Sequence, residues 1–139
     1  MTTDSLPAPP RPEPGLETRP YWEALREHRL VIQRCSDCLR LRHYPRPLCP
    51  HCYAFDHDWV TASGRGSVHS WTVCHHPFHP GFKRDVPYTM LTVDLEEGVR
   101  LLGRLTDSGT DRLRLGLPVM LDFIDVDDAL TLPAFRLLD

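Results

Sequence analysis

The sequence predicts a mainly β protein with a short N-terminal helix, a zinc ribbon and a five-stranded barrel of the oligonucleotide/oligosaccharide-binding (OB) type. Two Cys-x-x-Cys pairs, Cys35–Cys38 and Cys49–Cys52, lie close together as in a zinc ribbon. After them, short alternating runs of apolar and polar residues are bounded by turn residues, which indicates a small closed barrel. The 14 prolines among 139 residues disfavour long helices.

Composition and charge narrow the class of protein. The chain is 41% hydrophobic and 25% charged, as expected of a globular domain. Its net charge of −3 and pI near 6.2 disfavour a strong nucleic-acid binder, which usually carries a basic face. No signal-peptide core opens the sequence, and no apolar run approaches the ~20 residues of a membrane helix. We therefore expect a cytoplasmic protein without a membrane partner, in which paired cysteines bind metal more often than they form disulfides.

The chain is expected to contain three segments. Residues 1–17 include five prolines and no apolar periodicity, which predicts a disordered Pro-rich tail rather than a docking peptide. Residues 18–62 are expected to form the helix and the zinc ribbon, and residues 63–139 the OB-fold barrel.

The helix is expected within residues 18–28. Thr18 can cap its N-terminus, and Pro20 is tolerated in a first helical turn. So short a helix needs tertiary or partner contacts to persist. Its aromatic face therefore packs on its own domain or docks a partner, and in our functional hypothesis it docks. This face consists of Tyr21, Trp22 and Leu25.

The two cysteine pairs are expected to bind one Zn²⁺. Four thiolates complete a tetrahedral site and leave no position for water, so this Zn²⁺ would be structural. A redox dithiol or disulfide pair and a relic site without metal are the alternatives. His51 is expected to be a bystander or a donor to a sulfur, while His43 and His57 are expected at the surface.

Strands are predicted on both sides of the second cysteine pair. Residues 63–67 contain two glycines around Arg65 and predict a turn or bulge, and the absence of a following Gly-Lys-Ser/Thr excludes a phosphate loop. The predicted ribbon strands are residues 29–34, 39–44 and 55–61, and the predicted barrel strands are 68–74, 87–94, 99–105, 117–126 and 130–138.

The loop of residues 74–87 has three histidines, two phenylalanines and three prolines, and is too apolar for an idle connection. Three readings compete with a loop that is merely ordered by its prolines. The first is a second metal site, and the second is a nucleophile pair of Cys74 with a neighbouring histidine. The third, which we favour, is a binding surface with apolar anchors and a polar rim. The metal site would use His75, His76 and His79; the binding surface would use Phe78 and Phe82 with the histidines, Lys83 and Arg84.

An ordered set of motifs resembles the DUF35 family. The matching positions are Tyr21-Trp22, Cys35, Cys38 and residues 45–52, 63–70, 86–88, 95–100 and 116–119. Together they cover about residues 18–126. This resemblance implies a rubredoxin-like zinc ribbon followed by an OB fold. It also implies a non-catalytic scaffold subunit that works with a thiolase-like partner, namely a thiolase, an acyltransferase or an aldolase that shortens CoA-linked side chains, including those of steroids.

The residues agree with such a role, because no convincing nucleophile–base pair or open metal position is present. We expect contacts with the partner or with the phosphates of acyl-CoA, for which arginine and lysine have the right charge. The candidates are Tyr21, Trp22, Leu25, Arg46, Phe78, His79, Phe82, Lys83 and Arg84.

Two other functions remain open at this level. A single-stranded nucleic-acid module could stack bases on Trp71 and Tyr88, although these are better explained as barrel residues and the acidic stretch of residues 122–128 disfavours a phosphate track. A free-standing enzyme would use Cys74 or the histidines.

Overall fold

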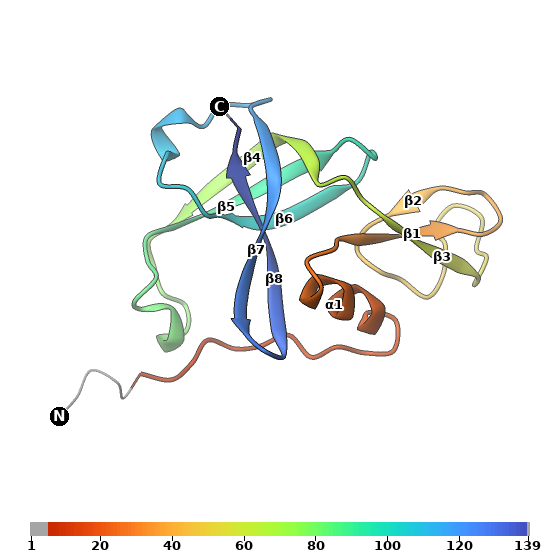
Figure 1. Cartoon of the computed structure of the whole chain (residues 1–139), viewed down its shortest axis with the longest axis horizontal. Coiled ribbons are helices and arrows are strands. Elements are labelled where there is room, and N and C mark those ends of the chain that lie inside the picture. The colour runs from red at the N-terminus through yellow and green to blue at the C-terminus, as the bar shows by residue number, and fades with distance from the viewer. Residues whose placement is uncertain (1–5, 139) are drawn as a thin grey trace.

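The computed structural model describes residues 6–138 and shows a ribbon sheet beside a barrel, with one helix between them (Figure 1). The helix α1 is Arg19–Arg26. The ribbon strands are β1 (Val31–Cys35), β2 (Leu41–Arg42) and β3 (His57–Thr61), which pair antiparallel in the order β2-β1-β3. The predicted strand over residues 39–44 is therefore reduced to two residues, because the chain on either side belongs to the cysteine turns.

The second half of the chain forms a closed five-stranded barrel. Its strands are β4 (Arg65–Cys74), β5 (Tyr88–Leu95), β6 (Arg100–Leu105), β7 (Pro118–Asp127) and β8 (Leu130–Leu137), with the short 3-10 helices η2 (Pro80–Phe82) and η3 (Thr110–Arg112) in its loops. The strand order is β4-β5-β6-β8-β7, closed by pairing of β4 with β7. The β6–β8 pair is parallel and all the others are antiparallel. This is the five-stranded OB fold that the sequence predicted.

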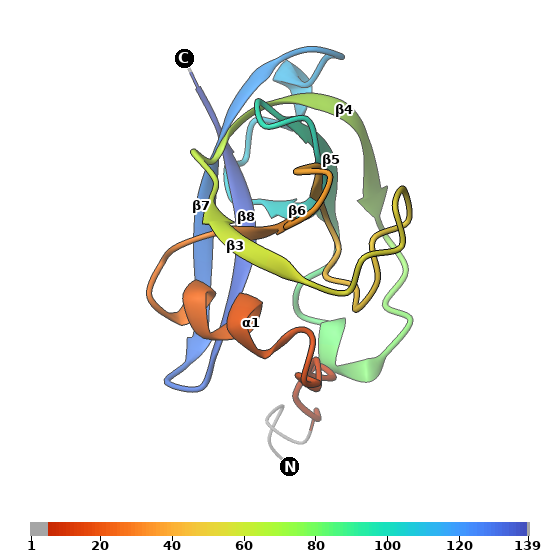
Figure 2. The same cartoon turned by 90° about the vertical axis from the view of Figure 1, so that its right-hand side faces the viewer.

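Helix α1 packs on its own protein. Leu25 is 0% exposed and Tyr21 is 4% exposed, so the predicted docking role of these two side chains is wrong. They lie in the core because α1 contacts β8 on one side and β1 on the other (Figure 2). Thr18 is the N-cap residue but makes no capping bond, since its hydroxyl accepts the backbone N–H of Gly15 instead.

One hydrophobic core runs through the helix, the ribbon and the barrel. Leu25 and Ile32 belong to the same cluster as Val93, Leu101 and Phe135. The ribbon by itself buries little apolar surface. Because its apolar side chains share one core with the barrel, the orientation of the ribbon relative to the barrel is set by this core.

Glycine is required at two close approaches in the barrel. Gly64, where the chain leaves the ribbon, has a φ of +85°, and a Cβ there would lie 2.8 Å from the Cβ of Leu121. A Cβ on Gly103 would lie 2.8 Å from the ring of Phe135, so β6 and β8 can pair only without a side chain at this position.

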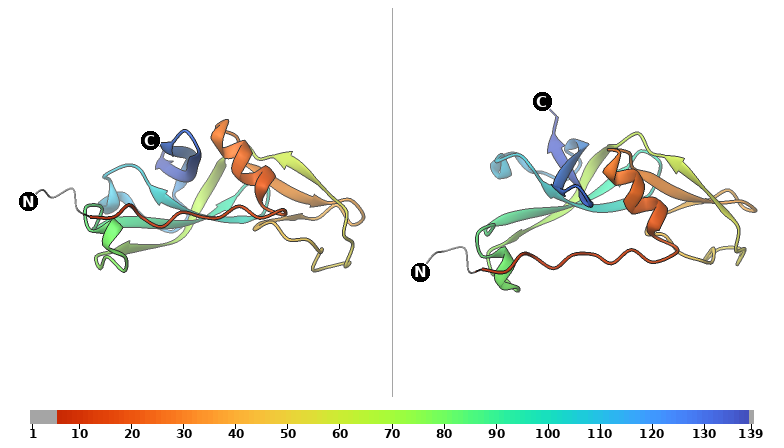
Figure 3. Two further views of the ribbon diagram at one scale, coloured as in Figure 1. Left: turned by 90° about the horizontal axis from the view of Figure 1, so that it is seen from below. Right: turned by 60° about the horizontal axis from the view of Figure 1, so that its bottom comes forward.

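Residues 6–15 contain no helix or strand and run from α1 towards η2 (Figure 3). Arg11 donates from both terminal nitrogens to Asp127, at 2.8 and 3.1 Å. Pro9 lies so close to Gly81 that a Cβ on Gly81 would come within 2.5 Å of its nitrogen. Residues 6–17 thus have a defined course where the sequence predicts disorder, and residues 1–5 of that tail lie outside the described residues. Within residues 6–138, no helix has the length and apolar character needed to cross a bilayer.

Candidate metal centre and binding surfaces

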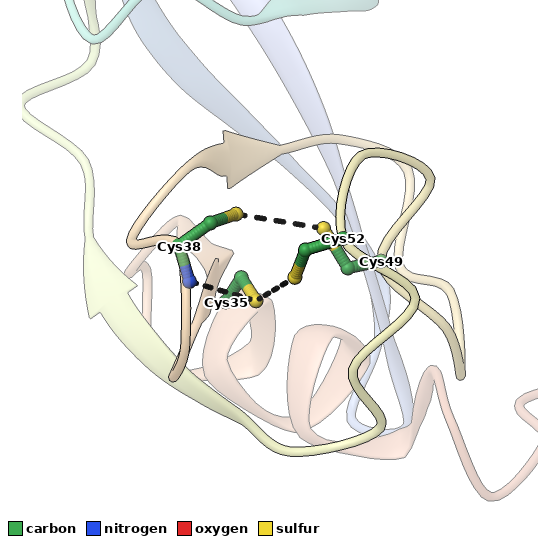
Figure 4. A group of neighbouring side chains, drawn as sticks. All are labelled: Cys35, Cys38, Cys49 and Cys52. Carbon is green, nitrogen blue, oxygen red and sulfur yellow. Dashed lines mark hydrogen bonds between the residues drawn. The ribbon is translucent and has the colours of Figure 1, made fainter.

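Four cysteine sulfurs converge at the end of the ribbon (Figure 4). Cys35 ends β1, Cys38 lies in the turn that follows, and the other two lie in the turn between β2 and β3. The Sγ atoms of Cys35 and Cys52 are 3.5 Å apart, and those of Cys38 and Cys49 are 3.7 Å apart. All four sulfurs lie within 4.8 Å of one another. Tetrahedral zinc with Zn–S bonds of about 2.3 Å needs sulfurs about 3.8 Å apart, so the geometry fits Zn²⁺.

The two cysteine turns repeat the same local structure. Leu39 and Tyr53, four residues after Cys35 and Cys49, have left-handed φ angles of 65° and 63°. Each donates its backbone N–H to the carbonyl of the first cysteine of its pair, at 3.0 Å. This conformation reverses the chain and turns both sulfurs of a pair to the same side.

Backbone N–H groups inside the turns also point at the sulfurs. Those of Cys38 and His51 donate to the sulfurs of Cys35 and Cys49, respectively. Hydrogen bonds from the backbone of Cys52 and His51 lower the pKa of Cys49 to about 6. The backbone N–H of Ala54 lowers the pKa of Cys52, but the hydrogen bond with Cys35 and the neighbouring sulfurs outweigh it and raise that pKa to about 12.

Protein groups alone therefore do not keep all four sulfurs ionised at neutral pH. A bound cation is what makes four adjacent thiolates compatible, and four thiolates suit Zn²⁺. All four coordination positions are then filled by protein, which leaves none for substrate or water. The metal would be structural.

A buried glutamine holds the ribbon around this site. Gln33 is fully buried, and its Oε1 accepts from Arg42 Nε at 2.6 Å and from the Arg46 backbone N–H at 2.8 Å. Its Nε2 lies 3.2 Å from His57 Nε2, and His57 is half-buried rather than the expected surface residue. His43 is also wrongly predicted, because both of its ring nitrogens are buried. His51, in contrast, is exposed, and its Nδ1 lies 2.7 Å from Nη1 of Arg40. It is not one of the four converging metal-ligand residues.

The loop after β4 has an exposed phenylalanine and a histidine that caps a short helix. Phe78 is 91% exposed. His79 caps η2, since its Nδ1 accepts the backbone N–H of Gly81 at 2.9 Å. Within residues 6–138, the four cysteines are the only group of metal-ligand residues that converges, so the alternative site of His75, His76 and His79 is not formed.

A mostly apolar pocket of about 380 Å³ lies between α1 and the barrel. We call it the α1–barrel pocket. Three of the predicted contact residues, Tyr21, Trp22 and Phe82, line it. Its other walls come from β5, β6, β7, β8 and the ribbon segment at Tyr44. The exposed Arg46, Lys83 and Arg84 lie outside this lining.

Family models match most of the chain. Residues 22–58 match the model described as ChsH2, rubredoxin-like zinc ribbon domain, and residues 59–123 match the ChsH2 C-terminal OB-fold domain. A solved structure described as "Ltp2-ChsH2(DUF35) aldolase" is 46% identical and has a TM-score of 0.83, covering 91% of this chain and 98% of that chain.

The chain belongs to the DUF35 family.

Three curated relatives extend this comparison. A "Probable enoyl-CoA hydratase alpha subunit" of Thermomonospora curvata is 46% identical over 96% of this chain and 42% of the relative. A "3-oxo-4,17-pregnadiene-20-carboxyl-CoA hydratase alpha subunit" of Mycobacterium tuberculosis is 40% identical over 85% of this chain and 37% of the relative. A "DUF35 domain-containing scaffold protein" of Pyrococcus furiosus is 35% identical over 71% of this chain and 72% of the relative. The chain thus spans about two fifths of the length of the first two.

Sequence reasoning missed several walls of the α1–barrel pocket in this DUF35 protein. Met90 and Leu102 lie on the outer face of β5 and β6, where alternation predicts polar residues, and Arg104 lies on the same face. The signal was present in the consecutive pair Leu101-Leu102, because one of two adjacent strand residues must face outward.

Proposed function

We propose that this DUF35 protein is a non-catalytic accessory subunit of an acyl-CoA enzyme complex, in which a thiolase-superfamily partner carries the catalytic residues. The observation that carries the proposal is the likeness to the aldolase-associated chain, which extends over 98% of that chain. The relatives described as alpha subunits and as a scaffold protein point to the same kind of assembly.

The chemistry of the described residues supports an auxiliary role. A four-thiolate site is closed to substrate, and among the described residues the side chain of Cys74 is hydrogen-bonded to Tyr88 and not to a histidine. The partner reaction would be an aldolase or thiolase step on a CoA thioester. The name of the M. tuberculosis relative supports a steroid or other lipid side chain as the acyl group. A cytoplasmic location of the complex is part of the proposal.

Two surfaces would make the contacts. Phe78 projects from the loop after β4 as an apolar anchor, and Lys83 follows η2 on the same loop. Arg84 and the ribbon's Arg46 are further candidates for contact with the partner or with the phosphates of CoA. The nucleic-acid alternative is less favoured, because α1 covers part of the barrel face on which OB folds bind oligonucleotides.

Co-expression with a thiolase-like protein encoded beside this chain tests the proposal. We expect one stable complex, and a partner that is insoluble or inactive when made alone. Phe78→Ser should weaken co-purification without changing the melting temperature. Phe55→Ser is the matched control, because Phe55 is also exposed, at 75%, but lies on the ribbon. A monodisperse and fully active partner without this chain would overturn the proposal.

A further inference from the structure

Residues 6–15, which we call the strap, follow a defined course from α1 to the loop after β4 although they bury little surface (Figure 3). All of them except Leu6 and Pro12 are exposed, so burial of apolar side chains does not explain this course. Five of the ten residues are proline. Proline fixes φ and keeps the chain extended, which lowers the entropy that is lost when the strap is ordered. A few specific contacts are therefore enough to hold it in place.

The first contact ties the strap to the turn between β7 and β8. Arg11 donates from its two terminal nitrogens to the two carboxylate oxygens of Asp127, at 2.8 and 3.1 Å. One of these oxygens also accepts the backbone N–H of Ala129 at 2.9 Å, which orients the carboxylate within its own turn. The hydrogen bonds from Arg11 and Ala129 lower the pKa of Asp127 to about 2, so the pair stays ionised at neutral pH. Two parallel hydrogen bonds fix the direction of the strap as well as its position.

The second contact places the backbone of the strap on η2. A Cβ on Gly81 would lie 2.5 Å from the nitrogen of Pro9 and 2.6 Å from the carbonyl carbon of Ala8. Gly81 does not have a left-handed φ, so other residues could adopt its backbone conformation. Glycine is needed here because the strap lies against it, and any side chain at this position would displace the strap.

The loop of residues 74–87 contacts the barrel through its second half. The ring of Phe82 lies 5.9 Å from that of Tyr88, and Asp85 accepts from Arg104 at 3.4 Å. This last hydrogen bond is long, and the loop belongs to the kind of segment that opens locally at low free-energy cost. The contact of Gly81 with the strap adds a support at the middle of the loop.

The strap supports this loop without covering its exposed side chains. With the strap in place, Phe78 is still 91% exposed, and Lys83 is exposed as well. The strap is therefore placed to hold the loop and not to shield it.

We propose that the strap is an intramolecular brace, which ties η2 to the β7–β8 turn and so holds the loop of residues 74–87 in the conformation that presents Phe78 and Lys83. Arg11 and Gly81 are its positioning residues. The bracing itself is a property of this chain alone. Its use, presentation of the loop to the partner, rests on the proposed function and deepens it.

Hydrogen–deuterium exchange of the zinc-loaded full chain tests the brace. The amides to follow are those of Phe82, Lys83 and Asp85, which donate to carbonyls within the loop. Arg11→Gln should accelerate their exchange by about two- to fivefold, the range expected for loss of a surface ion pair. Gly81→Ala should accelerate it by at least as much, because the added Cβ displaces the strap.

Two comparisons separate bracing from local effects. Arg29→Gln removes an equally exposed ion pair, that of Arg29 with Glu27, and should leave exchange in the loop unchanged. The double variant of Arg11→Gln and Gly81→Ala should exchange as Gly81→Ala alone does, because both substitutions break the same connection. Raising NaCl from 0.05 to 0.5 M should accelerate exchange in the wild type relative to Arg11→Gln, since salt screens the exposed pair.

Unchanged exchange in Arg11→Gln, an equal change in Arg29→Gln, or multiplied effects in the double variant would overturn the brace. Both strap variants should also weaken co-purification with the partner. Full co-purification in spite of faster exchange would overturn the presenting role. Failure of the accessory function is distinguishable, because the wild type then forms no complex while exchange in the loop still responds to Arg11→Gln.

Discussion

Replacing His43 with phenylalanine should remove an acid-sensitive weak point of this fold. The His43 ring lies 5.4 Å from the ring of Tyr21 and 4.0 Å from that of Tyr44. Both ring nitrogens are buried, and neither has a hydrogen-bond partner among the described residues. Burial lowers the pKa of His43 to about 4 from its ordinary value of 6.5. A phenylalanine ring keeps the shape of the aromatic contact and carries no proton.

The size of the effect follows from the difference between the two pKa values. Below pH 6.5 the unfolded chain binds a proton at His43, whereas the folded chain does so only near pH 4. Above pH 6.5 the His43 ring therefore has no effect on the pH dependence of the free energy of unfolding. As the pH falls below 6.5, protonation of His43 in the unfolded chain lowers that free energy. With 1.36 kcal/mol per pKa unit, the loss is about 1 kcal/mol at pH 5.5, about 2 kcal/mol at pH 5, and about 3 kcal/mol at its limit.

Urea unfolding at pH 7.5 and pH 5.5 measures this loss. Both proteins are kept in excess zinc, and bound metal is assayed at both pH values so that ligand protonation is not mistaken for the histidine effect. We expect the wild type to lose about 1 kcal/mol more than His43→Phe between these pH values. The ion pair of His28 with Asp125 is present in both proteins and cancels in the comparison. Equal losses, or a His43 ring that titrates near pH 6.5 by NMR, would refute the reasoning.

The other predictions concern the metal centre, the helix and the ribbon–barrel junction. Cys38→Ser removes one of four thiolates and should unfold the ribbon, because zinc supplies on the order of 10 kcal/mol to such folds; a folded ribbon without bound zinc would contradict this. Leu25→Ala should lower the free energy of unfolding by about 2–5 kcal/mol, whereas the exposed Leu16→Ala should change it by less than about 0.5 kcal/mol. Equal effects in urea titrations would count against the core position of α1. Gly64→Ala should lower the melting temperature more than Gly98→Ala. Both residues have positive φ, +85° and +90°, but only Gly64 has a side chain 2.8 Å from the added Cβ.

Much of the candidate site could be predicted because metal ligation is local. The spacing of Cys35, Cys38, Cys49 and Cys52 already places two sulfurs on each of two turns, and one further pairing of β1 with β2 brings the turns together. The histidines could not be predicted in this way. His43 follows β2 and His57 begins β3, and both are partly buried through contacts with Tyr21 and Gln33, which lie far from them along the chain and which no local pattern shows.

The sequence by itself determined the modules of this protein, because each has a signal within a few tens of residues: a cysteine spacing, an alternation of apolar residues, or a turn. Only the tertiary structure decided what lies between them. Leu25 and Tyr21 pack into the core since α1 meets both β1 and β8. The outer face of β5 and β6 becomes a pocket since Trp22 and Phe82, sixty residues apart, close over it. Such contacts depend on how two folded modules share one core, and that arrangement is not encoded in any single stretch of chain.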